Sequence, residues 1–542
     1  MLAAICCGAG NAQAGHGVSD DPPVGWWRDA VFYEIFVRSF ADAASGPLAG
    51  DGIGDLQGVI EHLDYLNDGR GAAGASLGVN AVWLMPIQPS PSYHGYDVSD
   101  YFSVNREFGD VALCRRFVAE AHRHGIRVIM DLVLNHASSE HPLFRAALAA
   151  QRGDLARELF RFADVPEEIV GPWEQRAWHP GGGQFYYGVF SPTMPDWNFR
   201  SAAVTEHHRR VAAFWLNEVG VDGFRLDAVK YFFETGEELQ DTAETREWLR
   251  EFTRYCHEVK PGSFVVGEDT GRSREIARYI RGGSLDSAFE FDLSKAIYEA
   301  IRLQTPGILS QAVGRLEAMY AGDAAWATFL TNHDQERVRT QLGDSAAKAR
   351  LAAKLAFTLP GVAFLYYGDE LGMRGAKPDP ELRTPMPWTA ALPNAGFAKP
   401  AVKPWHVLNP DFRAVNVATE AATPGSMLML YRRLIRLNAI SPALRHGTPI
   451  KVSASDSRVY AELRASPDDA VLVLANLGET PLRDWTVTMD RTPWPAEWSA
   501  REELEGVAVA TPSPAGNGRV SDWRPVAELP AESVYVVRWT RR

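Results

Sequence analysis

The stretch RVIMDLVLNH (127–136) is a continuous apolar run that ends in a polar cluster, and this pattern recurs along the chain. The run is short and rich in β-branched residues, which indicates a strand buried on both faces of a sheet. Similar runs are VFYEIFVRSF (31–40), VNAVWLMPI (79–87), VDGFRLDAV (221–229), SFVVGED (263–269), SAFEFD (287–292), AWATFLTNHD (325–334) and GVAFLYYGDE (361–370). Helix-like segments such as 110–125 and 203–220 separate them. Eight alternating strand and helix units predict an α/β fold, a closed (β/α)8 TIM barrel.

Two regions depart from this alternation. The length of 542 residues suits one large catalytic domain with smaller additions. The barrel is expected over 23–136 and 200–440. The stretch between these parts, 137–199, is rich in Gly, Pro and aromatic residues, and it predicts an inserted subdomain after the third strand. Over 441–542, short strand-like runs alternate with turn clusters, which predicts a C-terminal antiparallel β domain, a β-sandwich.

Residues 1–22 are expected to form a leader rather than part of the barrel. A short apolar run, Leu2 to Cys7, and the small-residue ending Ala12-Gln13-Ala14 resemble the end of a secretory signal peptide. The basic start of such a peptide is missing, so a plain disordered leader is the alternative. Export would place the protein outside the cell or in the periplasm. The sequence contains no apolar stretch long enough for a membrane span.

The composition argues against some classes of partner. The formal net charge of −13 argues against nucleic acid and against anionic membrane surfaces, which both attract basic patches. The 16 tryptophans suit a carbohydrate cleft, because the C–H faces of sugars pack on flat apolar rings. Most of these rings are equally expected in the core.

Polar side chains follow four of the predicted strands, in each case at the C-terminal end. They are Asp131, Asn135 and His136 on the third strand, Arg225 and Asp227 on the fourth, Glu268 on the fifth, and Asn332, His333 and Asp334 on the seventh. A single such group is commonly structural, as a satisfied carboxylate or a helix cap. Four on one rim are hard to explain by packing, and barrel enzymes build their sites at this rim. The sequence therefore predicts an active site there.

Three carboxylates of this set, Asp227, Glu268 and Asp334, favour glycoside chemistry. A retaining glycosidase uses one carboxylate to attack the anomeric carbon. A second, roughly 5 Å away, protonates the leaving oxygen and then activates water. The acid keeps its proton near neutral pH when burial and a neighbouring negative charge raise its pKa. Arg225 lies two residues before Asp227, on the same face of the strand, where a cation would keep Asp227 ionised.

Five motifs resemble those of a known family. They are DLVLNH (131–136), GFRLDAVKY (223–231), VVGED (265–269), FLTNHD (329–334) and MPDWN (194–198), in which Trp197 replaces the Leu of MPDLN. With these motifs the chain resembles the α-amylase superfamily, family thirteen of the glycoside hydrolases. The resemblance implies that Asp227 is the nucleophile, Glu268 the general acid/base and Asp334 the stabiliser of the transition state.

The same resemblance implies a set of substrate contacts. They are Tyr96, whose ring would stack on the first sugar, Asp97, His136, Arg225, Lys230 on the leaving-group side, His333 and Arg383. Taken without the motifs, His136 and His333 are more readily explained as core histidines, and Lys230 as a solvated side chain. Asp131 is expected to be structural and to support the cluster from below.

A structural calcium ion is expected in the loop DAASGPLAGDGIGD (42–55), which resembles the DxNxDGxGD loop of some relatives. The implied ligands are Asp42, Asp51, the carbonyl of Ile53, and Asp55. Hard oxygen ligands and Gly-permitted turns suit Ca²⁺. A solvated acidic turn is the alternative. At another calcium position of the family, where the inserted domain meets the barrel, Asn135 is present but Tyr231 stands in place of a His.

The flanking motifs narrow the expected activity. MPDWN, LTNHDQERV (330–338) and KPDPELRTPMPWT (377–389) most resemble an intermediate group of α-amylases, between the oligo-1,6-glucosidases and the neopullulanases. We therefore expect endo-type hydrolysis of α-1,4-glucosidic bonds in starch or maltooligosaccharides, through a covalent glucosyl enzyme. A monomer without an organic cofactor is expected. The alternatives are an exo-acting α-glucosidase, a transglycosylase or isomerase such as trehalose synthase, and, more remotely, a non-catalytic partner protein.

Overall fold

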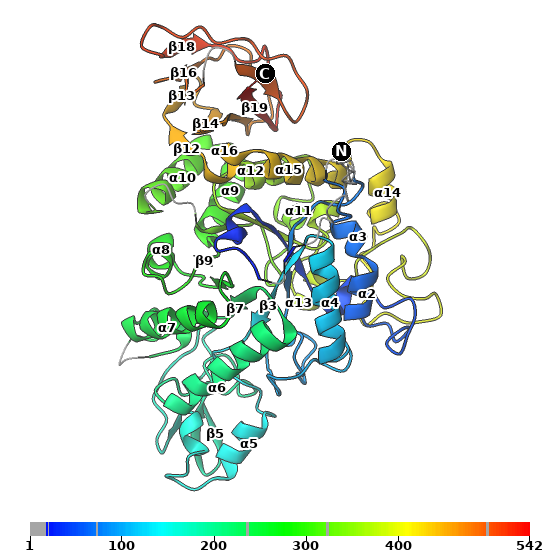
Figure 1. Ribbon diagram of the computed structural model, residues 1–542, viewed down its shortest axis with the longest axis vertical. Coiled ribbons are helices and arrows are strands. Elements are labelled where there is room, and N and C mark those ends of the chain that lie inside the picture. Colours follow the sequence, from blue (N-terminus) through cyan, green and yellow to red (C-terminus); the bar gives the residue numbers. More distant parts are fainter. Residues whose placement is uncertain are drawn as a thin grey trace, which may run out of the picture.

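The computed structural model describes residues 18–19, 21–71, 74–234, 238–320, 325–494 and 498–541, and Figure 1 shows how its parts are arranged. The leader predicted over 1–22 lies outside these ranges, except for residues 18, 19, 21 and 22. Within the described part of the chain, no helix is both long and apolar enough to cross a membrane. The inserted region and the C-terminal region lie at opposite ends of a central barrel.

Eight parallel strands form this barrel. They are β1 (Val31–Ile35), β2 (Ala81–Leu84), β3 (Arg127–Leu132), β7 (Gly223–Leu226), β8 (Phe264–Gly267), β9 (Ser287–Ala288), β10 (Ala327–Thr328) and β11 (Val362–Tyr366). They pair in the order β10-β11-β1-β2-β3-β7-β8-β9, and an isolated parallel bridge between Phe289 and Ala327 joins the two ends. Each strand falls inside one of the eight apolar runs, so the predicted (β/α)8 barrel is confirmed.

Helices surround the barrel (Figure 1). The longer ones are α4 (Val111–Arg123), α6 (Ala202–Ala213), α7 (Ala243–Val259), α8 (Ser273–Arg281), α9 (Phe291–Leu303), α10 (Pro306–Tyr320), α12 (Ala346–Thr358) and α15 (Met427–Ile440). The shorter ones are α1 (Val37–Phe40), α2 (Leu56–Glu61), α3 (Leu63–Leu66), α5 (Pro142–Ala149), α11 (Val338–Gln341), α13 (Asp379–Leu382), α14 (Val417–Ala422) and α16 (Pro442–His446), with the tight turns η1 (Trp26–Asp29), η3 (Arg157–Leu159), η5 (Val229–Tyr231) and η6 (Asp369–Leu371) and the wide turn η4 (Phe214–Val219). In α4, Asp110 caps the first turn by accepting from the N–H of Leu113. Cys114, Phe117 and Ala121 then form one buried stripe, which packs the helix on the barrel.

The inside of the barrel changes from apolar to polar along the strands. Residues two apart on a strand face the same side, so Phe32 and Glu34 share a face of β1, and Ile129 and Asp131 share a face of β3. Phe32 and Ile129 belong to a buried, mainly aromatic cluster, in which Phe32 stacks on Phe364 with the ring centroids 4.4 Å apart. The polar member of each pair lies one layer further along, so the aromatic cluster is the floor of the polar layer.

Antiparallel sheets make up the two additions to the barrel. Between β3 and β7, a three-stranded sheet pairs β4 (Phe162–Ala163), β6 (Gln184–Tyr187) and β5 (Trp178–Gly181) in that order. After α16, a five-stranded sheet (β12-β14-β15-β19-β17) and a three-stranded one (β13-β16-β18) share an apolar core. Their bounds are β12 (Thr448–Ile450), β13 (Val452–Ala454), β14 (Val459–Ser466), β15 (Asp469–Asn476), β16 (Val487–Met489), β17 (Trp498–Glu502), β18 (Val520–Trp523) and β19 (Ser533–Arg541). The fold therefore has the predicted insertion after the third strand and the predicted C-terminal antiparallel β region.

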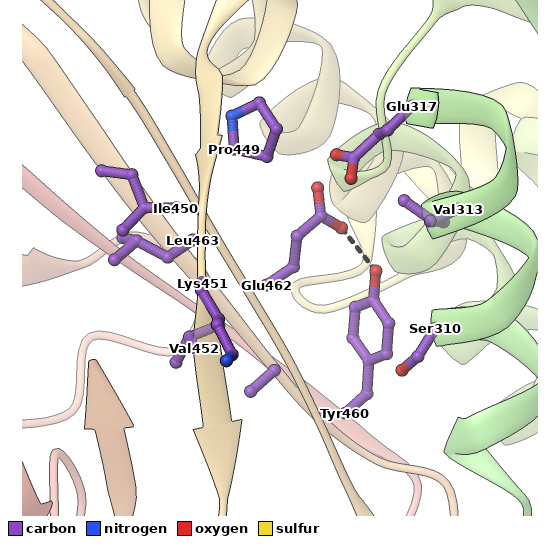
Figure 2. A pocket seen from close by; sticks show the side chains of 12 residues that line it. Ser310, Val313, Glu317, Pro449, Ile450, Lys451, Val452, Tyr460, Glu462 and Leu463 are labelled. Atoms are coloured by element: carbon purple, nitrogen blue, oxygen red, sulfur yellow. Dashed lines mark hydrogen bonds between the residues drawn. The ribbon is translucent and has the colours of Figure 1, made fainter. Parts of the chain in front are cut away.

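A cavity of about 320 Å³ lies where the barrel meets the C-terminal sheets, between α10 and the strands β12 to β14 (Figure 2). Two carboxyl groups line it, Glu317 on α10 and Glu462 on β14. Glu462 accepts from the hydroxyl of Tyr460, and its Oε1 lies 2.9 Å from Nε of Arg464, so its charge is matched. None of the residues predicted for the active site lines this cavity.

Candidate active site

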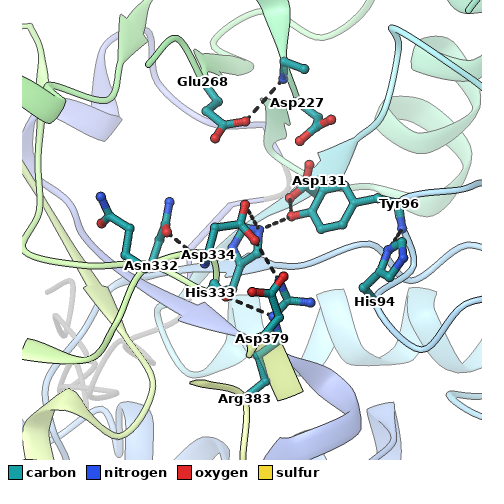
Figure 3. Close-up of polar contacts among 12 residues, drawn as sticks. His94, Tyr96, Asp131, Asp227, Glu268, Asn332, His333, Asp334, Asp379 and Arg383 are labelled. Atoms are coloured by element: carbon teal, nitrogen blue, oxygen red, sulfur yellow. Dashed lines mark hydrogen bonds and ion pairs between the residues drawn. The ribbon is translucent and has the colours of Figure 1, made fainter. Parts of the chain in front are cut away.

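The three predicted catalytic carboxyl groups lie at one rim of the barrel, in loops that follow its strands. Asp227 and Glu268 come directly after the last residues of β7 and β8, which pair with each other in parallel. Asp334 lies in the loop after β10. In Figure 3 the three carboxyl groups surround a common opening. The structure thus brings together groups that the sequence places at separate strand ends.

One arginine joins most of this acidic cluster. The buried guanidinium of Arg225 has its Nη1 2.8 Å from Oδ1 of Asp227 and 2.8 Å from Oδ1 of Asp131. Its Nη2 lies 2.8 Å from Oε2 of Glu268. Nη1 donates charge-assisted hydrogen bonds that hold the carboxylates of Asp227 and Asp131 in one orientation, and the contact of Nη2 with Glu268 is an ion pair. Arg225 therefore sets the relative positions of Asp227 and Glu268, and it does so from the strand face on which its sequence spacing placed it.

Burial is the main influence on the pKa values of Asp227 and Glu268, two of the carboxyl groups that contact Arg225. Burial raises the pKa of Asp227 to about 6, with the charges of Asp131 and Asp334 adding to it and that of Arg225 opposing it. Burial likewise raises the pKa of Glu268, against the charge of Arg225 and with that of Asp227. At neutral pH Asp227 is therefore mainly ionised, while Glu268 keeps its proton to a higher pH than a free glutamic acid.

Asp334 is the exposed member of the trio, with 46% of its side chain open to solvent. Its Oδ1 accepts from Nη2 of Arg383 at 2.7 Å, and its Oδ2 lies 3.3 Å from Nε2 of His333. The surrounding protein alone would raise its pKa. The charges of His333, Arg383 and Arg225 outweigh this effect and hold the pKa of Asp334 well below its usual range. Asp334 is therefore a fixed anion at the mouth of the site.

Tyr96 links the two halves of the cluster. Its hydroxyl lies 3.0 Å from Oδ2 of Asp131 and 2.6 Å from Nε2 of His333, and its ring stacks on that imidazole with the centroids 5.3 Å apart. His136 donates from Nε2 to the carbonyl of Tyr96 at 3.0 Å, and burial lowers its pKa to about 4. Among the described residues, its buried Nδ1 has no hydrogen-bond partner. His136 is therefore neutral at physiological pH and is held beside Tyr96 by the bond from its Nε2.

Two predicted substrate contacts lie apart from this cluster. Asp97 is buried and accepts from the hydroxyls of Ser90, at 2.5 Å, and Ser92. It ties its own loop together, and its contact with substrate stays a prediction. Lys230 donates from Nζ to Oγ1 of Thr270 at 2.9 Å, two residues beyond the predicted acid/base. Its contact with substrate likewise stays a prediction.

Sequence reasoning missed two acidic groups near the trio. Glu34 on β1 is buried, and its Oε1 lies 2.5 Å from Nδ1 of His333. The run VFYEIF carries the signal, because a single carboxylate inside an apolar strand is costly to bury without a partner. Asp379, at the start of α13, lies 3.4 Å from Nη2 of Arg383 and shares this cation with Asp334. Asp379 belongs to the stretch KPDPELRTPMPWT (377–389), but nothing in that stretch marks it as a partner of Arg383.

The loop predicted to bind calcium turns its carboxylates onto backbone N–H groups. Asp42 and Asp55 each accept two of these groups, at 2.7 to 3.0 Å. Asp51 accepts the N–H of Ile53 at 2.8 Å. Throughout the described ranges, no group of three or more His, Cys, Asp or Glu side chains is arranged to hold a metal ion. The side chains of the loop are not arranged as a metal site in this structure, and calcium binding there stays a prediction.

At the junction of the inserted region with the barrel, an arginine supplies a positive charge. Arg161 pairs with the buried carboxylate of Glu234, and its guanidinium lies 4.1 Å from the ring centroid of Tyr187. Burial raises the pKa of Asp196, in the MPDWN motif, with help from the charge of Glu234 and against that of Arg161. Asn135 lies beside Asp196. The junction therefore holds a cationic side chain beside its buried carboxyl groups.

The chain is similar to proteins of one family over most of its length. The family model for the alpha amylase catalytic domain matches residues 34–447. Alpha-amylase 3 of Dictyoglomus thermophilum is 36% identical over 455 residues, which cover 83% of this chain and 85% of that protein. A trehalose synthase/amylase of Mycobacterium tuberculosis is 31% identical over 526 residues, covering 85% of this chain and 84% of the relative.

A solved structure agrees with this similarity in three dimensions. The crystal structure of an alpha-amylase from H. orenii aligns with a TM-score of 0.80 at 34% identity, and the alignment covers 94% of this chain and 99% of the other. The matched range includes the strand ends that carry Asp227, Glu268 and Asp334. This protein is therefore an enzyme of the α-amylase family of glycoside hydrolases.

Proposed function

We propose that this enzyme hydrolyses α-1,4-glucosidic bonds in starch or maltooligosaccharides, with retention of configuration at the anomeric carbon. The observation that carries the proposal is the pair of carboxyl groups on one arginine. Asp227 and Glu268 follow adjacent strands, and each has an oxygen 2.8 Å from the guanidinium of Arg225. Such closely held groups suit attack by one and proton transfer by the other, whereas inversion needs a wider gap for water.

The two groups act in two steps. In the first, a carboxylate oxygen of Asp227 bonds to C1 of the sugar, the bond from C1 to the leaving oxygen breaks, and Glu268 gives that oxygen its proton. In the second, Glu268 takes a proton from water, the water oxygen bonds to C1, and Asp227 leaves as a carboxylate. The pKa directions support these roles, because Asp227 is mainly ionised at neutral pH while Glu268 keeps its proton longer than usual.

The groups around this pair suit the binding of a glucosyl unit. Asp334 supplies a fixed negative charge for the positive charge that develops on the sugar ring. Tyr96 offers a flat ring for the C–H face of the first sugar. These contacts become stronger as the ring flattens and gains charge, which is where binding speeds the reaction.

Transfer in place of hydrolysis is the second candidate, because the chain is 31% identical to a protein named trehalose synthase/amylase. Both reactions share the glucosyl enzyme and differ in whether water or a sugar hydroxyl accepts the glucosyl group. We favour hydrolysis because the relative at 36% identity and the structure aligned with a TM-score of 0.80 are both named as alpha-amylases. The MPDWN motif adds to this, as it resembles that of the intermediate α-amylase group.

Product analysis separates these candidates. After incubation with soluble starch, maltose, trehalose or cyclodextrin, we expect a spread of maltooligosaccharides from starch, each released in the α configuration by NMR. Trehalose from maltose would assign an isomerase, glucose alone from starch an exo-glucosidase, and β-configured products an inverting enzyme.

Two variants test the roles of the pair. Asp227→Asn should abolish turnover of starch at an unchanged melting temperature, because the amide is a poor nucleophile. Glu268→Gln should act on an activated aryl α-glucoside faster with added azide and yield the α-glucosyl azide, because azide needs no general base. Substantial starch turnover by either variant would contradict its assignment.

A further inference from the structure

A row of aromatic side chains leads from the site onto the inserted region. The ring centroid of Phe190 lies 5.4 Å from that of His136 and 5.3 Å from that of Tyr231. Trp173 packs on Phe190 at 5.4 Å, and 70% of the Trp173 surface is exposed. Exposed apolar groups that continue a binding site commonly belong to it. A ligand that contacts the whole row would have to be larger than one sugar.

The segment that carries Trp173 is tied to the strand side of the row. Gln175 accepts from the N–H of Trp173 at 2.8 Å and donates to the carbonyl of Val189 at 2.6 Å. The N–H of Gly171 donates to the carbonyl of Gln175 at 2.7 Å and closes the turn. The backbone that carries Trp173 is thus fixed before a ligand arrives, which lowers the entropic cost of binding.

The row lies on the side of the site where the leaving group departs. The N–H of Ala228 lies 3.4 Å from Oε2 of Glu268, so the short segment from Ala228 to Tyr231 passes beside the proposed acid. Within this segment, Lys230 donates to Oγ1 of Thr270, two residues past Glu268. The sugar whose oxygen Glu268 protonates therefore meets Tyr231 and the rings beyond it.

The opposite side of the site has its own aromatic groups. Tyr93 stacks on Trp405 with the centroids 5.6 Å apart, and the guanidinium of Arg383 lies 5.7 Å from the Tyr93 ring. Arg383 bonds Asp334 at 2.7 Å, so these rings belong to the side of the first sugar. Trp405 donates its indole N–H to Ser39 and is part of the framework. Trp173 and these rings therefore serve opposite ends of a bound chain.

We propose that Trp173 and Phe190 form a platform for the second and further glucosyl units on the leaving-group side of the cleaved bond. The platform rests on the proposed function, since Glu268 defines that side. Its occupant is an α-1,4-linked glucan chain, because the C–H faces of glucosyl rings pack on indole and phenyl rings. Trp173 lies two ring-to-ring steps from His136, which places it beyond the first leaving sugar. The enzyme should therefore favour long chains over disaccharides.

Chain-length dependence tests this platform. In Trp173→Ala, we expect kcat/KM for maltoheptaose to fall about three- to tenfold, the range for loss of an aromatic contact. With 4-nitrophenyl α-maltoside it should stay unchanged, because the aryl leaving group carries no further sugar to reach the indole. Trp173→Tyr should keep most of the activity on maltoheptaose. Ile440→Ala, a matched exposed apolar control at the end of α15 and far from the insertion, should alter neither substrate (Figure 1).

Two outcomes would overturn the platform. An equal fall for both substrates would mean that the variant disturbs the site as a whole. An unchanged kcat/KM of Trp173→Ala for maltoheptaose would mean that the exposed indole does not contact the glucan, and a protein partner would then be its candidate ligand. If the wild type does not cleave maltoheptaose at all, the proposed function fails, and calorimetric titration with maltoheptaose then decides: equal affinity of wild type and Trp173→Ala overturns the platform, and weaker binding by the variant supports it.

Discussion

Glu34 and His333 form a buried pair inside the barrel, with Oε1 of Glu34 2.5 Å from Nδ1 of His333. On its other side, Nε2 of His333 lies 3.3 Å from Oδ2 of Asp334. Burial alone would lower the pKa of His333, but the charges of Asp334 and Glu34 raise it to about 9. The imidazole is therefore protonated at neutral pH, donates from Nδ1 to Glu34 and from Nε2 to the hydroxyl of Tyr96, and forms an ion pair with Asp334. Glu34 is a positioning residue that acts on Asp334 through His333.

Glu34→Gln should lower kcat more than it changes KM. The amide keeps the shape and still accepts from Nδ1, but it removes the charge that favours the protonated His333. Asp334 then loses part of its positive surroundings in the transition state. We expect a fall of about tenfold in kcat on maltooligosaccharides, equal to about 1.4 kcal/mol. Glu34→Ala, which also removes the acceptor, should fall further. A Glu34→Gln enzyme with wild-type kcat would show that the charge has no role.

The same pair predicts a loss of stability at alkaline pH. The folded-state pKa of His333, about 9, lies above its usual value of 6.5. Its stabilisation is therefore complete below about pH 6.5 and is lost as the pH rises through about 9. Melting temperatures of the wild type should fall across this window. In Glu34→Gln the fall should be smaller, because its imidazole has less charge to lose. Parallel curves for the two proteins would contradict the linkage.

The acid limb of the activity profile should report Asp227. We expect kcat/KM to rise as the pH passes through about 6, where Asp227 loses its proton, and to fall at higher pH, where Glu268 loses its own. Asp131→Asn removes a negative charge that raises the pKa of Asp227 and frees Nη1 of Arg225 for it. The acid limb should therefore move to lower pH in this variant. A folded variant whose limb stays in place or moves up would contradict this coupling.

The barrel and the trio could be predicted because the chain repeats one simple pattern. A parallel sheet covered on both faces needs continuous apolar strands, and these stand out as runs such as 127–136. The C-terminal ends of such strands meet at one rim. Asp227 and Glu268 could therefore be placed together, with Arg225 beside them, from strand spacing alone.

Contacts between distant loops have no such pattern. Glu34 and His333 are 299 positions apart, and only the closed barrel brings them into contact. Trp173 stands in a long insertion without periodicity, so nothing in its neighbours shows that it packs on Phe190. Such features depend on tertiary packing, which local sequence does not encode.

The charged junction of the inserted region gives a stability prediction. Arg161→Met leaves the buried Glu234 without its cation, and it should lower the free energy of unfolding by about 3 kcal/mol in urea denaturation. Arg152→Met is the matched control, because its pair with Asp164 in the inserted region is exposed. It should change the free energy by less than about 1 kcal/mol. Equal effects in the two variants would mean that the Arg161 charge has no special place at this junction.

Calcium binding at residues 42–55 is the remaining prediction. Burial raises the pKa of Asp55 to about 6, and the charge of Asp42 adds to the rise, so two acidic groups lie close together in this loop. The loop also supports the site, because its Gly52 accepts from the N–H of Trp405 at 2.8 Å. Excess chelator should therefore lower the melting temperature, and calcium should restore it by mass action. Magnesium should restore it less, because it demands a stricter geometry.

Asp51→Ala separates a metal effect from a folding effect at this loop. Asp51 is exposed and accepts a single N–H, that of Ile53, so its loss should cost little when no metal is present. The variant should therefore melt with the wild type in chelator, and it should gain less from added calcium, because it lacks one predicted oxygen ligand. If chelator and calcium leave the wild-type melting curve unchanged, the prediction is wrong. The backbone N–H groups that Asp42 and Asp55 accept are then sufficient to hold the loop.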